Sequence, residues 1–136
     1  MGRYRQEFQR SLTQPDEFWR AAARLIDWYT EPTAVLDRSD PPLYRWFTGG
    51  TLNTCFNAVD RHVRDGRAGQ PALIYDSPVT GSQRVMTYRE LLEEVARAAG
   101  VLAGLGVAAG DRVVIYMPMV PEAVMAMLAC ARIGAV

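Results

Sequence analysis

His62 is the residue whose type is best suited to acid–base chemistry, because an imidazole titrates near neutral pH. It stands in the run Asp60-Arg61-His62, at the end of a predicted helix, and no nucleophile is paired with it. A solvated or helix-capping histidine is therefore favoured over a catalytic base. Since the chain has 1 histidine, a metal cluster built from histidines is excluded.

Two carboxylates and a glycine pair are further candidates for a ligand site. Asp111 follows Gly110 and is expected to accept backbone amides ahead of a strand rather than to hold a ligand. Glu122 follows Pro121 and fits the first turn of a helix, where the helix dipole contributes ~0.3–1 kcal/mol. Gly49-Gly50 could approach a phosphate, but the segment contains no lysine and a tight turn is favoured.

The sulfur-containing residues are expected to be structural. Cys55 and Cys130 lie far apart in apolar contexts and form no CxxC pair, which favours buried thiols in a reducing compartment over a disulfide. Four methionines near the C-terminus are interpreted as core filler and not as a metal site: Met117, Met119, Met125 and Met127.

Composition excludes several kinds of chemistry. All 15 basic residues are arginine, so the chain can supply neither the lysine of a phosphate-binding P-loop nor a Schiff-base lysine. The formal net charge is +0, which gives no electrostatic footprint for nucleic acid or an anionic membrane. The sequence therefore assigns no catalytic, no cofactor-binding and no metal-ligating residue.

The N-terminal half has a helical pattern followed by an irregular one. Residues 1 to about 30 are predicted to be helical, with Thr13 or Gln14 as a cap and Pro15 at a first helical position. Residues 31 to about 53 are rich in proline and aromatic side chains and are predicted to form an irregular arm. A further helix is predicted from residue 53 or 54 to Arg64.

The C-terminal half alternates between strand and helix patterns. A hairpin is predicted from strands at 72–75 and 84–87, and Thr87 with Glu90 forms the pattern of a capping box. The capping box begins a helix over 88–105. A strand over 111–116 and an apolar helix over 121–133, ended by Gly134, complete the pattern.

Strands that alternate with helices are typical of a parallel crossover sheet. We therefore predict the α/β class: a helical N-terminal arm, then a hairpin and βαβα units, incomplete at the C-terminus. A helix that is apolar nearly all round must be covered on every side, so we expect the front portion of a larger α/β enzyme. The predicted parts are an N-terminal extension over 1–66 and the start of a second domain over 67–136.

Several of these motifs resemble the adenylate-forming acyl-CoA synthetase superfamily. Thr87-Tyr-Arg-Glu-Leu resembles the first motif shared by its members. Gly110-Asp-Arg-Val-Val-Ile-Tyr-Met-Pro-Met-Val-Pro-Glu-Ala-Val is similar to the acetyl-/propionyl-CoA synthetase branch, as is Ala129-Cys-Ala-Arg-Ile-Gly-Ala-Val136. The segments 4–28 and 46–62 resemble the N-terminal extension of the same branch. Within it, Leu73-Ile-Tyr-Asp-Ser-Pro-Val-Thr-Gly81 and the segment 53–62 resemble propionyl-CoA synthetases more than acetyl-CoA synthetases.

This resemblance implies a ligase that joins a short carboxylate to coenzyme A in two steps. The carboxylate, propionate or acetate, attacks the α-phosphate of ATP to give an acyl-adenylate and pyrophosphate, and the CoA thiol then displaces AMP. ATP, Mg²⁺ and CoA are the implied cofactors, and the remainder of the synthetase chain is the implied partner. The family's phosphate-binding loop and its catalytic lysine do not occur in this sequence. We therefore expect the chain alone to be inactive, marginally stable and prone to association.

Two other interpretations stay open: a non-enzymatic interaction module or a subunit of a split synthetase, and an unrelated small α/β binding protein. The N-terminus has no apolar signal region, and the apolar stretch 120–133 is too short to span a bilayer. A cytoplasmic location is predicted, with the mitochondrial matrix as the alternative.

Overall fold

A computed structural model describes residues 2–136, and the chain folds as two compact units. The first unit ends at Leu52 and the second begins at Asn53. This division lies 14 residues before the predicted domain boundary between residues 66 and 67. That boundary concerns the domains of the larger protein and stays a prediction.

The first unit begins with two short helices. Helix α1 spans Arg3–Thr13 and α2 spans Pro15–Ala23, with Pro15 at the predicted first helical position. The helical prediction up to residue 30 is wrong beyond Ala23. There the Trp28 indole nitrogen donates a hydrogen bond of 2.9 Å to the Ala23 carbonyl, and Thr30 pairs with Thr51. These contacts supply an end for the helix and direct the backbone into an extended path.

The segment predicted as an irregular arm contains an antiparallel pair of strands. Strand β1 spans Ala34–Asp37 and β2 spans Arg45–Thr48, with Leu36 opposite Trp46. The irregular prediction is wrong here because the prolines lie outside both strands and remove no hydrogen bond from the ladder. Pro41 and Pro42 lie in the connection between the strands.

The second unit begins with a helical stretch whose residues Cys55 and Val59 are buried in the core. Residues 54–67 are helical, in agreement with the prediction, but two turns are of the π type: Phe56–Asp60 and Val63–Arg67. Gly66 has a φ of +83°, a conformation that favours glycine, and it lies at a kink within the second of these turns.

The hairpin and the first long helix follow the prediction closely. Strand β3 spans Pro71–Ser77, β4 spans Ser82–Thr87, and they pair antiparallel with Ile74 opposite Val85. Helix α3 spans Tyr88–Gly104 and starts with the predicted capping box. Glu90 N–H donates to the Thr87 hydroxyl at 3.3 Å, and Thr87 N–H donates to the Glu90 carboxylate at 2.7 Å.

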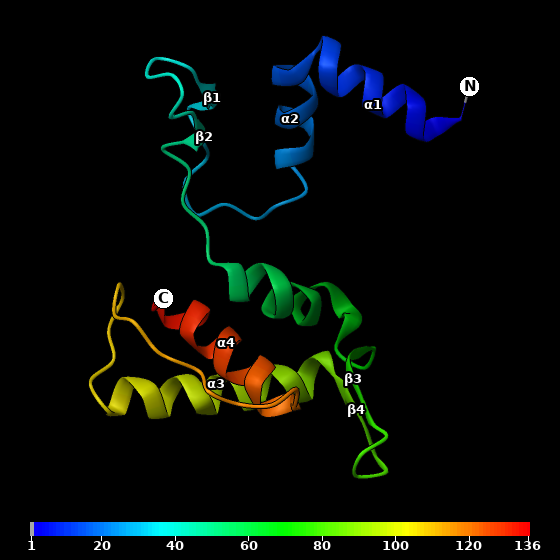
Figure 1. The fold of residues 1–136 in the computed structure, drawn as a ribbon, viewed down its shortest axis with the longest axis vertical. Helices are drawn as coiled ribbons and strands as arrows, with labels where there is room; N and C mark the ends of the chain where they lie inside the picture. Colours follow the sequence, from blue (N-terminus) through cyan, green and yellow to red (C-terminus); the bar gives the residue numbers. More distant parts are fainter. Residues whose placement is uncertain (1) are drawn as a thin grey trace. The chain divides into compact units, whose positions relative to one another are not determined.

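Helix α4 spans Pro121–Ile133 and packs against α3 (Figure 1). It ends at Gly134, whose φ of +79° is the left-handed C-terminal conformation. One core joins α3, α4, β4 and the 54–67 stretch. Its buried members are Cys55, Val59, Met86, Leu91, Val95, Ala99, Met125 and Ala129.

The strand predicted over 111–116 does not form as a regular strand. The segment runs from the end of α3 to the start of α4 (Figure 1) and makes one parallel pairing at its beginning. Val136 N–H donates to the Asp111 carbonyl at 2.7 Å, and Val113 N–H donates to the Val136 carbonyl at 2.8 Å. The described residues thus contain two antiparallel sheets of two strands each and no parallel sheet, because the segment has a strand partner at a single position.

Candidate functional site

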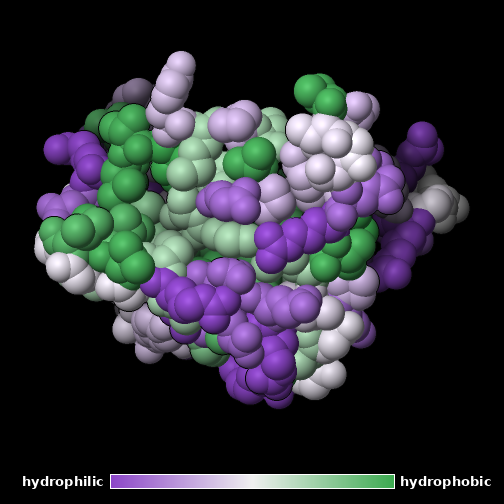
Figure 2. Space-filling view, turned by 90° about the horizontal axis from the view of Figure 1, so that it is seen from below, coloured by the Kyte–Doolittle hydropathy of each residue, from purple (hydrophilic) through white to green (hydrophobic). Residues whose placement is uncertain are grey.

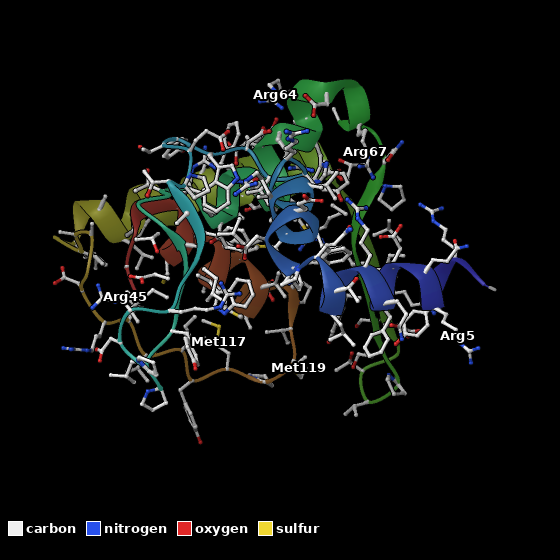
Figure 3. All side chains as sticks on the ribbon, turned by 90° about the horizontal axis from the view of Figure 1, so that it is seen from above. Arg5, Arg45, Arg64, Arg67, Met117 and Met119 are labelled. Atoms are coloured by element: carbon white, nitrogen blue, oxygen red, sulfur yellow. The ribbon has the colours of Figure 1, made fainter. Side chains whose placement is uncertain are left out.

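His62 lies at the N-cap position of the Val63–Arg67 turn, without a side-chain capping hydrogen bond, and it contacts aromatic and cationic groups. Its ring contacts the Tyr88 ring at a centroid separation of 4.8 Å and a tilt of 52°, and Nδ1 lies 3.2 Å from the Arg67 guanidinium. Figure 3 shows Arg64 and Arg67 on the same helical stretch. Partial burial and the charge of Arg67 lower the pKa of His62 below its usual value. This position agrees with the expectation of a histidine at a helix end, and the contact with Tyr88 is a feature that the sequence did not indicate.

The two carboxylates occupy the structural positions that the sequence predicts. Asp111 Oδ2 accepts a hydrogen bond of 2.8 Å from the Ala108 N–H, which closes the loop before the 111–117 segment. Glu122 lies in the first turn of α4 and is exposed. Both positions fit roles in loop closure and helix stabilisation.

The glycine pair forms a tight turn against an aromatic ring. Gly50 N–H donates to the Phe47 carbonyl at 3.0 Å, and Gly49 has a φ of +78°. A Cβ atom at Gly50 would lie 2.7 Å from Trp28 Cζ3. The turn therefore needs glycine at both positions for packing and backbone conformation.

The sulfur-containing residues divide between core and surface. Cys55 and Cys130 are buried and free, as predicted. Met125 lies in the core, but the core-filler prediction is wrong for the other three methionines: Met117 is 52% exposed, Met119 is 91% exposed and Met127 is 62% exposed. Figure 3 labels Met117 and Met119 in the part of the chain that leads to α4.

A polar cluster that sequence reasoning missed joins the 54–67 stretch to the end of α4. The Asn53 side-chain nitrogen donates to the carbonyls of Ala131 and Arg132, at 3.1 and 3.0 Å. Its side-chain oxygen accepts from the Phe56 N–H at 2.9 Å. One side chain thus caps the start of one helix and the end of another.

The same cluster contains an ion pair and a buried thiol. Arg132 donates to the Asp60 carboxylate at 2.8 Å and to Cys55 Sγ at 3.7 Å. Burial raises the pKa of the Cys55 thiol, although the Arg132 contact opposes this, so the group fits a structural role. The sequence does contain one indication of this cluster. Arg132 is a charged residue in an otherwise apolar helix, and such a residue needs a partner of opposite charge.

Among residues 2–136, no group of three or more histidine, cysteine, aspartate or glutamate side chains could hold a metal ion. A cavity of about 410 Å³ lies beside the β3–β4 turn and is lined by Asp76, Val79 and Met119 among others. Its polar lining contains no lysine or arginine. No helix in the described part of the chain is long and apolar enough to cross a membrane.

Two known protein families match consecutive parts of this chain. Residues 59–136 match the family of AMP-binding enzymes, so the chain belongs to that family. Residues 4–58 match the acetyl-coenzyme A synthetase N-terminus, which places the chain in the acetyl-CoA synthetase branch of the superfamily. The expected family resemblance is confirmed at this level.

Individual relatives agree with this assignment. The chain is 51% identical over 135 residues to acyl-CoA synthetase short-chain family member 3, mitochondrial, of Bos taurus, and the match covers 99% of this chain and 20% of the relative. It is 52% identical over 118 residues to acetyl-coenzyme A synthetase of Streptomyces avermitilis, covering 87% of this chain and 18% of that protein. The chain therefore spans about a fifth of the length of these relatives.

A solved structure supports the fold. Acetoacetyl-CoA synthetase from Streptomyces lividans matches with a TM-score of 0.86 and 36% identity, over 100% of this chain and 21% of that chain. The predicted class, a helical N-terminal part followed by the first hairpin and helices of an adenylate-forming domain, is thus confirmed. The parallel sheet predicted with it is not formed by residues 2–136.

Proposed function

We propose that this chain is the N-terminal part of an AMP-forming short-chain acyl-CoA synthetase that acts on propionate. The observation that carries the proposal is the family match, which begins in an acetyl-coenzyme A synthetase N-terminus and passes into an AMP-binding enzyme without a gap. In this proposal residues 1–66 form the N-terminal extension and residues 67–136 begin the adenylation domain.

The full-length enzyme would convert propionate, ATP and CoA to propionyl-CoA, AMP and pyrophosphate through an acyl-adenylate. Propionate is proposed because the end of β3 and the turn that follows it, Asp76-Ser-Pro-Val-Thr-Gly81, resemble propionyl-CoA synthetases. Acetate is the alternative substrate, and the Streptomyces avermitilis relative is named acetyl-coenzyme A synthetase.

The residues present in this chain do not fit binding sites for ATP, Mg²⁺ or CoA. The sequence contains no lysine for a phosphate loop. The described residues contain no group of acidic side chains that could hold a cation. No chemical step is therefore assigned to this chain. Its part in the proposed reaction is structural: Thr87 and Glu90 start α3, and Asp111 closes the loop before the 111–117 segment.

The proposal is tested by reading the gene through the codon for Val136 and purifying the whole product. We expect the reading frame to continue into a segment rich in glycine, serine and threonine that contains lysine. The product should form AMP from ATP with a higher kcat/KM for propionate than for acetate. The 136-residue chain alone should form no AMP.

Two results would contradict the proposal in different ways. A product that prefers acetate would refute the choice of substrate and leave the enzyme class in place. A stop codon after Val136 in an expressed gene, with the product bound to a separate chain that carries the missing loop, would identify a subunit of a split synthetase.

A further inference from the structure

The first unit contains a cavity between α2 and β1. It has a volume of about 240 Å³ and is lined by residues of α2, of the connection that follows α2 and of β1. Ala23 and Val35 line it and are 8% and 5% exposed, so the cavity reaches the buried apolar residues of this unit. A concave site with an apolar lining and a few polar groups is typical of sites that bind small molecules.

Three charged side chains line the same cavity: Arg20, Arg24 and Glu31. Arg20 lies in the last turn of α2, and Arg24 follows four residues later at its C-cap. Positions four apart on a helix are neighbours, and like charges there repel each other. The negative end of the helix dipole favours cations at this end of α2, but it does not account for Glu31. In the part of the chain that the structure describes, none of the three side chains has an ion-pair or hydrogen-bond partner.

The edges of the cavity are held in place by hydrogen bonds on both sides. The connection that carries Glu31 is fixed at Thr33, whose N–H and hydroxyl both donate to the Thr48 carbonyl, at 2.9 and 3.0 Å. The end of α2 is fixed by the Trp28 indole, which donates to the Ala23 carbonyl at 2.9 Å. The cavity is therefore formed before any ligand binds, and a preformed site loses less entropy on binding.

Charged side chains at a surface do not by themselves mark a site. On the face of the molecule drawn in Figure 2, hydrophilic and hydrophobic residues are mixed across the surface. The cavity of the first unit differs from such a surface, because two cationic side chains and one anionic side chain line the same hollow as two buried apolar residues. This combination suits a small molecule that carries both charges and a short apolar group.

We propose that this cavity binds a small aliphatic α-amino acid. The guanidinium groups of Arg20 and Arg24 bind the carboxylate, since guanidinium matches a carboxylate with paired hydrogen bonds. Glu31 binds the ammonium group, and the aliphatic side chain contacts Ala23 and Val35. A simple anion would pair with the arginines but leave Glu31 without a partner, whereas a zwitterion gives every charged group a partner. The site belongs to the first unit alone and does not depend on the proposed function or on the choice of propionate.

The test follows the tryptophan fluorescence of the 136-residue chain while L-valine is added. Trp28 is a local reporter, because its indole nitrogen donates to the carbonyl of Ala23, which lines the cavity. We expect a saturable change with a Kd of about 1 mM or below. Two matched ligands each lack one charge of L-valine: 3-methylbutanoate lacks the ammonium and 2-methylpropylamine lacks the carboxylate. Each should bind at least about tenfold more weakly, because it leaves charged groups of the site unpaired. Binding of 3-methylbutanoate as tight as that of L-valine would overturn the proposal.

Variants at exposed positions locate the binding. Arg20→Gln should weaken L-valine binding at least about tenfold, whereas Arg5→Gln on α1, which lies outside the cavity, should leave it unchanged (Figure 3). Glu31→Gln should remove the preference for L-valine over 3-methylbutanoate, because the ammonium then loses its partner. Circular dichroism should be the same for all three variants. Equal affinities in Arg20→Gln and Arg5→Gln would show that L-valine binds elsewhere and would overturn the proposal.

The longer protein provides the final test. Isothermal titration calorimetry of the whole gene product should show L-valine binding that Arg20→Gln weakens by at least about tenfold. Binding to the 136-residue chain without binding to the whole product would show that the rest of the polypeptide fills the cavity, and the proposal would be wrong. None of these measurements follows AMP formation, so failure of the proposed function would not imitate failure of this proposal.

Discussion

The two units of the chain differ in how they bury apolar side chains. In the second unit, eight buried residues from α3, α4, β4 and the 54–67 stretch form one core. In the described part of the first unit, the buried residues are Ala23 and Val35. Its large aromatic side chains pack against one another near the surface. The ring centroids of Trp46 and Trp19 are 5.7 Å apart, as are those of Phe47 and Trp28.

The difference in buried apolar side chains predicts a difference in stability between the two units. A continuous core supplies most of the free energy that holds a small domain together, and aromatic pairs add about 0.5–1.5 kcal/mol each. We therefore expect the second unit to unfold cooperatively and the first to unfold more easily. The two can be followed separately, because the 3 tryptophans, at positions 19, 28 and 46, all belong to the first unit.

The largest effect is expected from a substitution that creates a cavity in the core of the second unit. Met86 is 2% exposed, and Met86→Ala should lower the free energy of unfolding of that unit by about 2–5 kcal/mol. Urea unfolding followed by circular dichroism would measure the change. Met127, which is 62% exposed on α4, provides the control, and Met127→Ala should cost less than about 0.5 kcal/mol.

The same variant tests whether the units are independent. Tryptophan fluorescence should report an unchanged transition for the first unit in Met86→Ala. A shift of equal size in the circular dichroism and tryptophan fluorescence transitions would show that the two units unfold together. The proposed difference in stability between them would then be wrong.

The second effect concerns the ion pair between Asp60 and Arg132. Arg132→Met should destabilise the second unit by about 2 kcal/mol, because it leaves the partly buried Asp60 carboxylate without its 2.8 Å partner. Arg97→Met removes an exposed pair with Glu94 at 2.9 Å and should cost less than about 0.5 kcal/mol. Equal losses in the two variants, measured by urea unfolding, would show that burial does not strengthen the Asp60–Arg132 pair.

The third effect concerns the start of α3. Thr87→Ala removes the hydroxyl that accepts the Glu90 N–H and should cost about 1 kcal/mol. The Thr13 hydroxyl instead donates to the Gln9 carbonyl within α1, so Thr13→Ala should leave the second unit unchanged. A loss below about 0.3 kcal/mol for Thr87→Ala, roughly a third of the expected loss, would contradict the role of the capping box.

The second unit could be predicted from the sequence better than the first for a physical reason. Its elements are specified locally: the Thr87 and Glu90 box starts α3, and Pro121 and Gly134 bound α4. In the first unit the end of α2 depends on Trp28, and the strands depend on pairing across the Pro41–Pro42 connection. These contacts are tertiary, and no short pattern encodes them.

The polar cluster at the end of α4 was missed for a related reason. Asn53 and Asp60 reach residues 72 to 79 positions away in the sequence, and only the packing of helix on helix brings them together. The expectation that the chain supplies no catalytic residue stays a prediction from composition, because the chain contains no lysine and 1 histidine.

The smallest effect expected is a pH dependence confined to the second unit. The pKa of His62 is lowered below its usual value of 6.5 by partial burial and by the charges of Arg67 and Arg61. Its carboxylate neighbour Asp65 opposes this shift. The folded state therefore binds a proton less readily than the unfolded state, so stability should be full above pH 6.5 and should fall as the pH drops through 6.5 toward the lower folded pKa. Below that folded pKa the loss from this group stops growing, since both states are then protonated.

The variant His62→Gln keeps a polar side chain beside Tyr88 and removes the titration. Thermal unfolding of the second unit at pH 7.5 and at about pH 5.5, read by circular dichroism, should show a decrease in the original chain that His62→Gln abolishes. The tryptophan signal of the first unit should show no such His62-dependent change. If the original chain and His62→Gln lose stability equally over this range, a carboxylate elsewhere in the chain is responsible, and the packing of His62 on Tyr88 leaves protonation free.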